Sequence, residues 1–352
     1  MDLQQAIAAV QPPCEDSRAA ARHRFSDIAI PLGSLGLLQE AVAQLAAIQR
    51  TVRPSIAKRA VVMFCADNGV VAQGVTQCGQ EVTATVTENM GRGKSTVCLM
   101  AKHIGMDSFP VDIGVARDVE GERILRRKIR YGTADMTKEP AMTREEAVRA
   151  LETGIEMAEW CAAQGYKLVC GGEMGIGNTT TSAAVTAVLT GANVRDVTGR
   201  GAGLSSEGLE RKVRAIETAL KLHQPDPNDP VDILHKVGGL DIAGMAGFYL
   251  GAAACGLPVV LDGVISCAAA LIAVRLCPAV RDYLIAAHQS AEPAGRLLLE
   301  ALGYTPFISA GMRLGEGTGA VAAVAMIDLV LAAYDGMPSF DEAGIEAYQP
   351  LT

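Results

Sequence analysis

"IAGMAGFYLGAAACGLPVVLDGVISCAAALIAV", residues 242 to 274, decides how the chain folds, because it holds two apolar segments separated by a break. No charged residue occurs between 242 and 261, so a membrane-spanning helix is the first alternative to weigh. Gly256 and Pro258, however, stop a helix inside this run, and "PVVLDG" has the pattern of a short buried strand. The stretch therefore predicts helix, turn, strand and helix in a soluble protein.

The same alternation of strand and helix recurs along the chain. Strand-like runs, mostly followed by long Ala-rich segments, occur at 59–67, 107–115, 166–175, 257–265 and 306–311. Strands regularly separated by helices indicate βαβ crossovers, which make neighbouring strands parallel. We therefore expect an α/β fold with a mostly parallel sheet and helices on both faces.

The two ends of the chain differ from this pattern. "GLLQEAVAQLAAIQR", residues 36 to 50, predicts a helix that no strand precedes, and we group the tail "YDGMPSFDEAGIEAYQ" with it. We predict a small helical domain from residues 1–50 plus 335–352, and a large α/β catalytic domain over residues 51–334.

Composition narrows the class of partner. The net charge is −8 over 352 residues and no dense Lys/Arg block occurs, which argues against nucleic acid and favours small molecules. The nine cysteines never form a C-x-x-C pair, which indicates reduced thiols in a cytoplasmic protein and not a disulfide framework. The five histidines show no i, i+4 spacing, so we expect no metal site, and the N-terminus has no signal-peptide pattern.

Polar, Gly-rich segments follow the predicted strands. Ligands of open parallel sheets bind beyond the carboxyl ends of the strands, so we expect these segments to converge on one site. They are residues 65–83, 171–184, 198–212, 261–266 and 313–320.

"GGEMGIGNTTTSAA", residues 171 to 184, is a candidate phosphate site. Gly175 and Gly177 let the backbone approach a ligand, and Asn178 and Thr179 to Thr181 add donors at a helix N-terminus. Lys212, on a helix that begins near Ser205, is the candidate cation for this phosphate, although a solvated helix face is the alternative. As a dinucleotide-binding fingerprint the segment is weak, because Thr180 replaces the third glycine.

Three carboxylates accompany these loops. Glu316 in "RLGEGTGA" is a candidate general base, because apolar flanks would desolvate it and raise its pKa, and a first-turn helix acid is the alternative. Glu173 either binds ribose hydroxyls or caps the next helix. Asp262 either touches substrate or caps a turn, and alone it is a poor magnesium ligand.

"GRGKST", residues 91 to 96, resembles the end of a P-loop. The spacing places Glu88 where the motif requires glycine, and no strand leads into it. We therefore expect Arg92 and Lys94 to lie on an early helical turn, and we keep a nucleotide-binding ATPase as a rival function.

Several strings together resemble one known family in this order over nearly the whole chain: "PLGSLGLLQEAVAQLAAIQ", "ADNGVVAQGV", "GEMGIGNTTTSAAV", "TGRGAGL", "VGGLDIAGMAG", "LDGVISCAAALIA", "SAEPAG" and "MRLGEGTGA". The family is that of the nicotinate-nucleotide:dimethylbenzimidazole phosphoribosyltransferases of cobalamin biosynthesis. The resemblance implies a homodimer in which each subunit has a Rossmann-like large domain and a small helical one.

The resemblance also implies the reaction and the roles of individual residues. The 5-phosphoribosyl group of nicotinate mononucleotide would pass to 5,6-dimethylbenzimidazole or a related base, with inversion at the anomeric carbon and without a cofactor. Glu316 matches the catalytic base and Glu173 the acid near the ribose. The nucleotide contacts that the resemblance implies are Gly175, Gly201, Ala202, Gly203, Lys212, Ser290 and Leu314, and the candidate phosphate site adds Gly177, Asn178 and Thr179.

The incoming base is the least determined part. We expect it to be bound by Thr76, Gln77, Gln80 and Asp262. The relatives commonly carry an aromatic residue or a proline in the 76–80 loop, so the acceptor stays open between benzimidazoles, purines and phenols. A heterodimer with a paralogue and a non-catalytic ligand-binding module are further alternatives.

Overall fold

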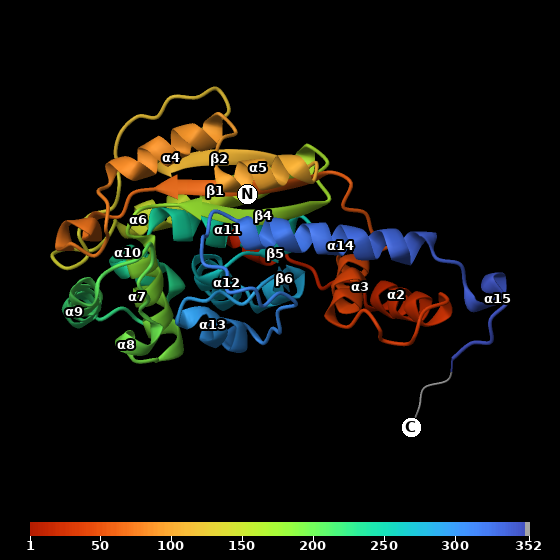
Figure 1. Ribbon diagram of the computed structural model, residues 1–352. Helices are drawn as coiled ribbons and strands as arrows, with labels where there is room; N and C mark the ends of the chain where they lie inside the picture. Colours follow the sequence, from red (N-terminus) through yellow and green to blue (C-terminus); the bar gives the residue numbers. More distant parts are fainter. Residues whose placement is uncertain (349–352) are drawn as a thin grey trace.

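A central sheet of six parallel strands organises the computed structural model, which describes residues 1–348 (Figure 1). The strand order is β3-β2-β1-β4-β5-β6. The strands are β1 (Arg59–Ala66), β2 (Asp107–Gly114), β3 (Leu125–Arg126), β4 (Leu168–Met174), β5 (Val259–Leu261) and β6 (Leu284–Ala286). The predicted α/β fold with a parallel sheet is confirmed, and it is parallel throughout.

One predicted strand was wrong and two short ones were missed. Residues 306–311 contribute only a single bridge, between Ile308 and His288, because Pro306 offers no N–H and the segment lies partly in solvent. β3 and β6 have two and three residues, which is too short for an apolar run to stand out from its surroundings.

Alternate residues of the strands face two separate cores. In β1, Val62 and Phe64 point into one apolar cluster, whereas Val61, Met63 and Cys65 point into the other. Because both faces are covered by helices, the sequence of β1 is a continuous apolar run and not an alternating one.

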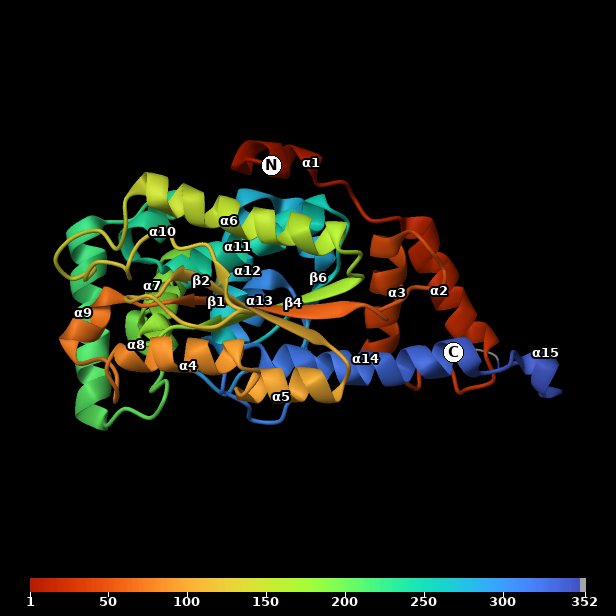
Figure 2. The same ribbon diagram turned by 90° about the horizontal axis from the view of Figure 1, so that it is seen from above.

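Helices cover the first face in a thick layer. Its central pair is α6 (Arg144–Ala163) and α11 (Leu240–Ala254), flanked by α12 (Val264–Leu276) and by α1 (Leu3–Ala9). Around them lie α7 (Asn178–Thr190), α8 (Val194–Val197), α9 (Ser206–His223), α10 (Pro230–Val237) and α13 (Ala294–Leu302). Figure 2 shows α1 and α6 on this side of the sheet.

The opposite face is covered by fewer helices. They are α4 (Glu81–Gly91), α5 (Thr96–His103), α14 (Thr318–Gly336) and, farther out, α2 (Glu15–Asp27) and α3 (Leu37–Gln49). Two 3₁₀ turns, Gly69–Gln73 and Pro278–Tyr283, and the short α15 (Phe340–Ala343) complete the described chain. Figure 2 shows α4, α5 and α14 together on this side.

The stretch 242–274 folds as predicted, into α11, a turn, β5 and α12. All residues of α11 from Leu240 to Ala253 are buried, so the absence of charge after Asp241 reflects a core position. Within residues 1–348, α14 alone is long and apolar enough to span a membrane, and half of that stretch is buried inside the protein.

The chain ends do not behave as one unit. α2, α3 and the far end of α14 form a group beside the sheet (Figure 1), where Phe25 and Tyr334 stack with ring centroids 4.7 Å apart. α1 lies instead against α6 and α11, and the Met1 ammonium is 2.8 Å from Glu159 on α6. Of the predicted segment 335–352, residues 349–352 lie outside the described chain.

"GRGKST" joins two helices. α4 ends at Gly91, Arg92 follows as its C-cap, and Ser95 caps α5 by accepting a hydrogen bond from the Cys98 amide. Lys94 therefore lies in the turn between the helices, and the expectation of an early helical turn for Arg92 and Lys94 was wrong. A P-loop needs a strand before it, so this geometry does not fit one.

Candidate active site

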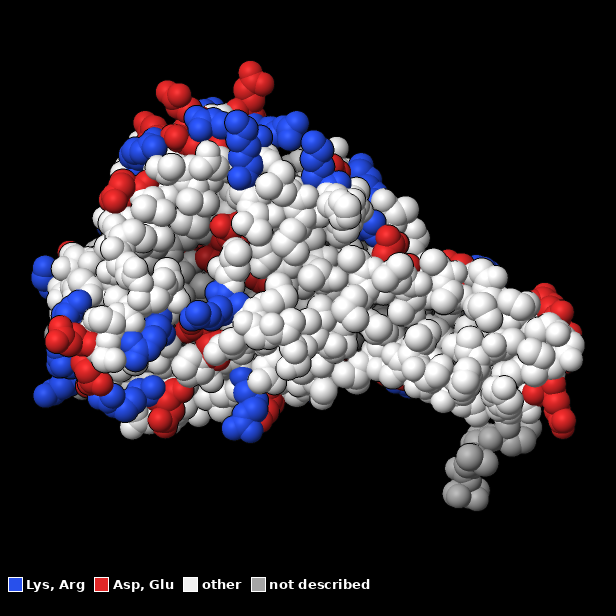
Figure 3. Space-filling view, in the orientation of Figure 1, with Lys and Arg blue, Asp and Glu red and all other residues white. Residues whose placement is uncertain are grey.

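A pocket opens above the carboxyl ends of β4 and β5, beside the point where the strand order reverses between β1 and β4. This is where open parallel sheets bind ligands. Figure 3 shows the hollow, with acidic atoms in its wall, on the face that carries α4 and the start of α14. All five predicted loops contribute to it. The lining comes from residues 75–78, 173–179, 200–204, 262–266 and 313–316 and from His288, Ser290 and Glu292.

Glu316 lines this pocket at the start of α14. Its backbone is left-handed, with φ 63°, between Gly315 and Gly317, which have φ 86° and 99°. The tight turn projects the carboxylate toward the N-terminus of α5, where Oε2 lies 3.5 Å from the Val97 amide nitrogen. Burial raises the pKa of Glu316, and the charge of Asp262 raises it further, while the Val97 amide lowers it.

Asp262 is the acid that caps α14. Its Oδ2 accepts a hydrogen bond from the Gly317 amide at 3.0 Å, and its Oδ1 accepts from Gly319 at 2.7 Å and from Ala320 at 3.3 Å. These are free N–H groups of the first helical turn, where a carboxylate is favoured. Of its two alternative roles, the structure shows the cap, although Asp262 also borders the pocket.

Glu173 is the penultimate residue of β4 and contacts the Glu316 backbone. It is buried, and its Oε1 accepts a hydrogen bond from the Glu316 amide at 3.2 Å. Its Oε2 accepts from the side-chain amide of Asn178. Burial, followed by the charge of Asp241, raises the pKa of Glu173 to about 8. It can therefore carry a proton near neutral pH.

The predicted phosphate turn opens α7. Gly177 precedes the helix, so the amide of Thr179 has no partner within the helix, whereas the Asn178 amide donates to the Gly175 carbonyl oxygen at 3.0 Å. Gly175 is required by close packing, since a Cβ there would clash with the Ala66 carbonyl oxygen. A second turn, Gly201 to Gly203 with Ala202, faces the same space, and both turns line the pocket. Together they form a concave surface of backbone N–H groups that suits an anion.

Lys212 lies directly behind these turns. Its side chain is 1% exposed, and Nζ donates to Thr179 Oγ1 at 2.7 Å and to the Gly199 carbonyl oxygen at 3.0 Å. No carboxylate within residues 1–348 forms an ion pair with it. Burial lowers its pKa to about 8. The solvated-face alternative is therefore wrong, and Lys212 is a buried amine behind the pocket wall.

The residues expected to touch the incoming base are only partly brought together. Thr76 and Gln77 line the pocket, and the Gln77 side chain donates to the Ala202 carbonyl oxygen at 3.3 Å. Gln80 is absent from the lining, because its side chain donates to the Asn68 carbonyl oxygen at 3.2 Å. Ser290 and Leu314 both border the pocket.

Comparison with known proteins gives a consistent family assignment. A family model described as Phosphoribosyltransferase matches residues 10–345. The chain belongs to this family. It is 47% identical, over 94% of each chain, to the nicotinate-nucleotide–dimethylbenzimidazole phosphoribosyltransferase of Acetivibrio thermocellus. It is 44% identical, over 100% of each chain, to the protein of that name from Ruminiclostridium cellulolyticum.

Solved structures agree with this assignment. The crystal structure of CobT from Thermus thermophilus superposes with a TM-score of 0.89 at 40% identity, and the match covers 95% of this chain and 100% of that one. The family resemblance that the motifs indicated is therefore confirmed, and the chain is a phosphoribosyltransferase.

Other pocket residues of this phosphoribosyltransferase escaped the sequence analysis. Arg200, Ser266, His288, Glu292 and Arg313 all line the cavity. His288 carries no sequence signal, because its polar neighbour, Asp262 Oδ1 at 3.5 Å from Nε2, is far away in the chain. Arg200 and Arg313 each lie inside a Gly-rich segment that was recognised, so their position within a candidate anion site was the available signal.

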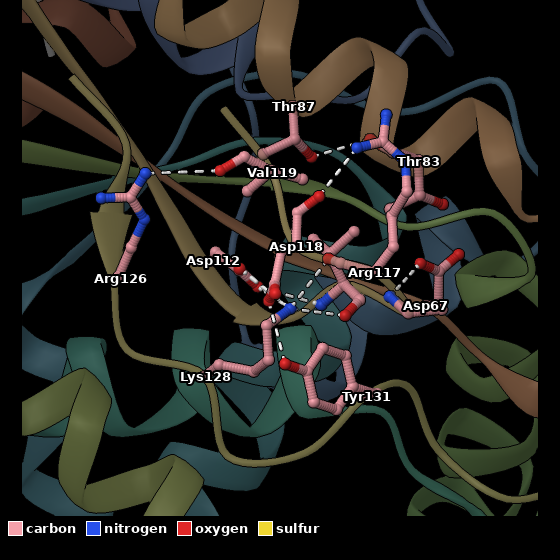
Figure 4. A network of polar contacts seen from close by, with 12 residues as sticks. Asp67, Thr83, Thr87, Asp112, Arg117, Asp118, Val119, Arg126, Lys128 and Tyr131 are labelled. Atoms are coloured by element: carbon pink, nitrogen blue, oxygen red, sulfur yellow. Dashed lines mark hydrogen bonds and ion pairs between the residues drawn. The ribbon is translucent and has the colours of Figure 1, made fainter. Parts of the chain in front are cut away.

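A separate polar network, shown in Figure 4, connects the segments that follow β1 and β2. Lys128 Nζ lies 2.9 Å from Asp112 Oδ2 and donates to the Val115 carbonyl oxygen at 2.6 Å. Asp67 Oδ2 accepts from the Ala116 amide at 2.7 Å. These contacts hold the segment after β2 against the end of β1, and none of these residues lines the pocket.

Among residues 1–348, no group of three or more His, Cys, Asp or Glu side chains is placed to hold a metal ion.

Proposed function

We propose that this phosphoribosyltransferase moves the 5-phosphoribosyl group of nicotinate mononucleotide to 5,6-dimethylbenzimidazole or a related base. The products are α-ribazole 5'-phosphate and nicotinate, for assembly of the cobalamin nucleotide loop. The observation that carries the proposal is one pocket that joins a partly desolvated carboxylate, Glu316, to two anion-binding turns backed by Lys212. The names of its full-length relatives support the same substrates.

The phosphate of the nucleotide binds at the two glycine turns in this proposal. The amides of Thr179, Gly201 and Ala202 supply backbone donors. The Asn178 and Gly203 amides already donate to backbone carbonyl oxygens within their turns. Lys212 supplies the positive charge, as a buried amine that no carboxylate neutralises among the described residues. With the phosphate held there, the ribose lies toward Glu173 and the anomeric carbon toward Glu316.

The chemistry requires little help at the leaving group. The pyridinium of nicotinate mononucleotide is cationic, so its departure neutralises it and needs no acid. The anomeric carbon passes through an oxocarbenium-like state, as in glycoside hydrolysis. A neutral benzimidazole attacks from the opposite face, which inverts the configuration. Its ring N–H becomes acidic as the new bond forms, and Glu316 accepts that proton.

A product assay with a panel of acceptors tests the reaction. The purified chain is mixed with nicotinate mononucleotide and, in turn, dimethylbenzimidazole, benzimidazole, adenine and phenol, and released nicotinate is measured. We expect release that depends on a benzimidazole. Binding of the nucleotide without release by any base would overturn the proposal in favour of a ligand-binding module, and Lys94-dependent ATP hydrolysis would favour an ATPase.

We also propose that the enzyme is a homodimer. Figure 3 shows a broad uncharged surface over α14 and the neighbouring α2 and α3. Leu329 of α14 is 74% exposed, and Leu99 of the adjacent α5 is 58% exposed. Large exposed apolar patches mark association surfaces.

A cytoplasmic location fits the nine free cysteines, which are all unpaired.

A further inference from the structure

Asp241 is a buried acid with no role so far. It is 0% exposed in the first turn of α11, and its carboxylate lies close behind Gly175, which lines the pocket. Burying a carboxylate is costly unless it is paired and hydrogen-bonded. No ion pair involves it within residues 1–348, and its Oδ1 has no hydrogen-bond partner. Its presence there therefore needs an explanation other than stability.

A chain of hydrogen bonds runs from Asp241 to the reacting end of the pocket. Its Oδ2 accepts from the side-chain amide of Asn178 at 2.9 Å. The same amide nitrogen donates to Glu173 Oε2. Glu173 Oε1 then accepts from the backbone amide of Glu316 at 3.2 Å. Three hydrogen bonds thus connect the core helix α11 to the turn that carries Glu316.

Glu316 needs such support because its backbone is strained. A non-glycine residue with φ 63° occupies a conformation that side chains disfavour by about 1 kcal/mol or more. Glu173 also fits closely against this turn, since a Cβ on Gly315 would clash with Glu173 Oε1. The position of the Glu173 carboxylate therefore determines where the Glu316 turn can sit.

Asp241 determines which end of the Asn178 amide faces Glu173. An amide can present either its NH₂ group or its oxygen to a neighbour, and the two have opposite hydrogen-bonding character. An ionised carboxylate only accepts, so Asp241 attracts the NH₂ group. The nitrogen has two hydrogens, and the second is then directed at Glu173.

We infer that Asp241 is a positioning residue of the transferase reaction, which acts through Asn178 and Glu173 to hold the Glu316 backbone in its left-handed conformation. The inference rests on the proposed function, in which Glu316 is the base. A displacement of the base by about 1 Å costs about 100-fold in rate, because proton transfer depends on close alignment. Asp241 therefore influences turnover without touching a substrate.

The test compares Asp241→Ala, Asp241→Asn and a matched control. Alanine removes the acceptor, and we expect kcat to fall about 10- to 100-fold while KM for nicotinate mononucleotide changes less than about threefold. Asparagine can still offer an oxygen to Asn178, so we expect it to restore most of kcat. Asp112→Asn removes another buried acid at the same sheet edge, outside the relay, and should leave kcat unchanged.

A crystal structure of the alanine variant gives a readout independent of activity. We expect the hydrogen bond between Glu173 Oε1 and the Glu316 amide to be lost and Glu316 to leave φ 63°. If the alanine variant does not fold, Asp241→Ser is used in its place. The serine hydroxyl is too short to reach Asn178, so this variant also removes the acceptor. An unchanged turn, a kcat loss no larger than in the Asp112→Asn control, or a loss confined to KM would overturn the inference. An inactive wild type whose turn still depends on Asp241 would count against the proposed reaction alone.

Discussion

Glu316 combines exposure to the pocket with partial burial, which is what a general base requires. We expect Glu316→Gln to bind nicotinate mononucleotide normally and to lose about 100-fold or more in kcat, because glutamine cannot accept the proton. Nucleotide binding is measured by calorimetry and turnover by nicotinate release.

Glu217→Gln is the matched control, since Glu217 is an exposed acid on α9. It should retain full activity. A Glu316→Gln enzyme with turnover within about threefold of the wild type would remove Glu316 from the mechanism.

Lys212 predicts a pH dependence of nucleotide binding. Burial lowers its pKa to about 8, so the free enzyme carries the ammonium below that pH and loses it above. We expect affinity for nicotinate mononucleotide to fall as the pH rises through about 8. Lys212→Met should weaken binding about 10- to 100-fold at about pH 7, the size of a charge-assisted hydrogen bond, and should flatten this dependence.

Lys221→Met on the same helix α9 is the control for this experiment, because Lys221 is exposed. It should change neither the affinity nor its pH profile. A steep loss of affinity above about pH 8 that persists in Lys212→Met would assign the titration to another group.

The position of a single residue at the pocket was predictable where the residue lies in or next to a recognisable sequence motif. Glu316 and Lys212 lie in or next to Gly-rich segments, and the structure places both at the pocket, one in its wall and one behind it. Gln80 does not line the pocket, and a short loop has no periodicity that would show which of its side chains turn inward. His288 meets Asp262 only through the fold, so no local pattern announced it.

At the scale of elements, the N-terminus of helix α14 is capped by a side chain from a different element, the end of strand β5. Its own N-cap residue is Gly317, which has no side chain, and Asp262 at the end of β5 binds three amides at the start of the helix. We expect Asp262→Asn to lower the free energy of unfolding by about 1–3 kcal/mol, because an amide hydrogen-bond donor then faces backbone donors. Denaturant unfolding measures the change.

Asp2→Asn provides the comparison, since Asp2 caps α1 and asparagine caps a helix about as well. It should change stability by less than about 0.5 kcal/mol. Equal effects of the two substitutions would show that the Asp262 carboxylate contributes no more than an ordinary cap.

Long elements were predictable and short ones were not. β1, β2 and β4 bury eight, five and seven residues, and their apolar runs end at polar loops, which is a strong local signal. β6 has three residues and exists because Leu284 and Ile285 pair with β5. The predicted strand at 306–311 failed for the converse reason, since only Ile308 found a partner. Pairing across the sheet, which local sequence does not encode, decided these cases.

At the scale of the whole molecule, the uncharged face of α14 is the expected dimer surface. We expect the chain to elute with about twice its mass of 36.7 kDa, and Leu329→Asp to shift it toward the monomer, because a buried unpaired charge opposes association. Light scattering coupled to gel filtration measures the mass.

Leu222→Asp is the control for this prediction, since Leu222 is 52% exposed on α9, away from α14. It should leave the mass unchanged. A wild-type monomer at micromolar concentration would contradict the homodimer directly.

The single helix α14 joins the reaction centre to the outlying group of α2 and α3. A 19-residue helix is about 28 Å long, and here Glu316 precedes its first turn while Tyr334, near its last, packs on Phe25. A rigid rotation of this helix by about two degrees about its outer end would displace its inner end by about 1 Å. A displacement of that size matters to proton transfer. The packing of α2 and α3 on the outer end of α14 therefore helps to fix the position of its inner end, where the Glu316 turn leads into the helix.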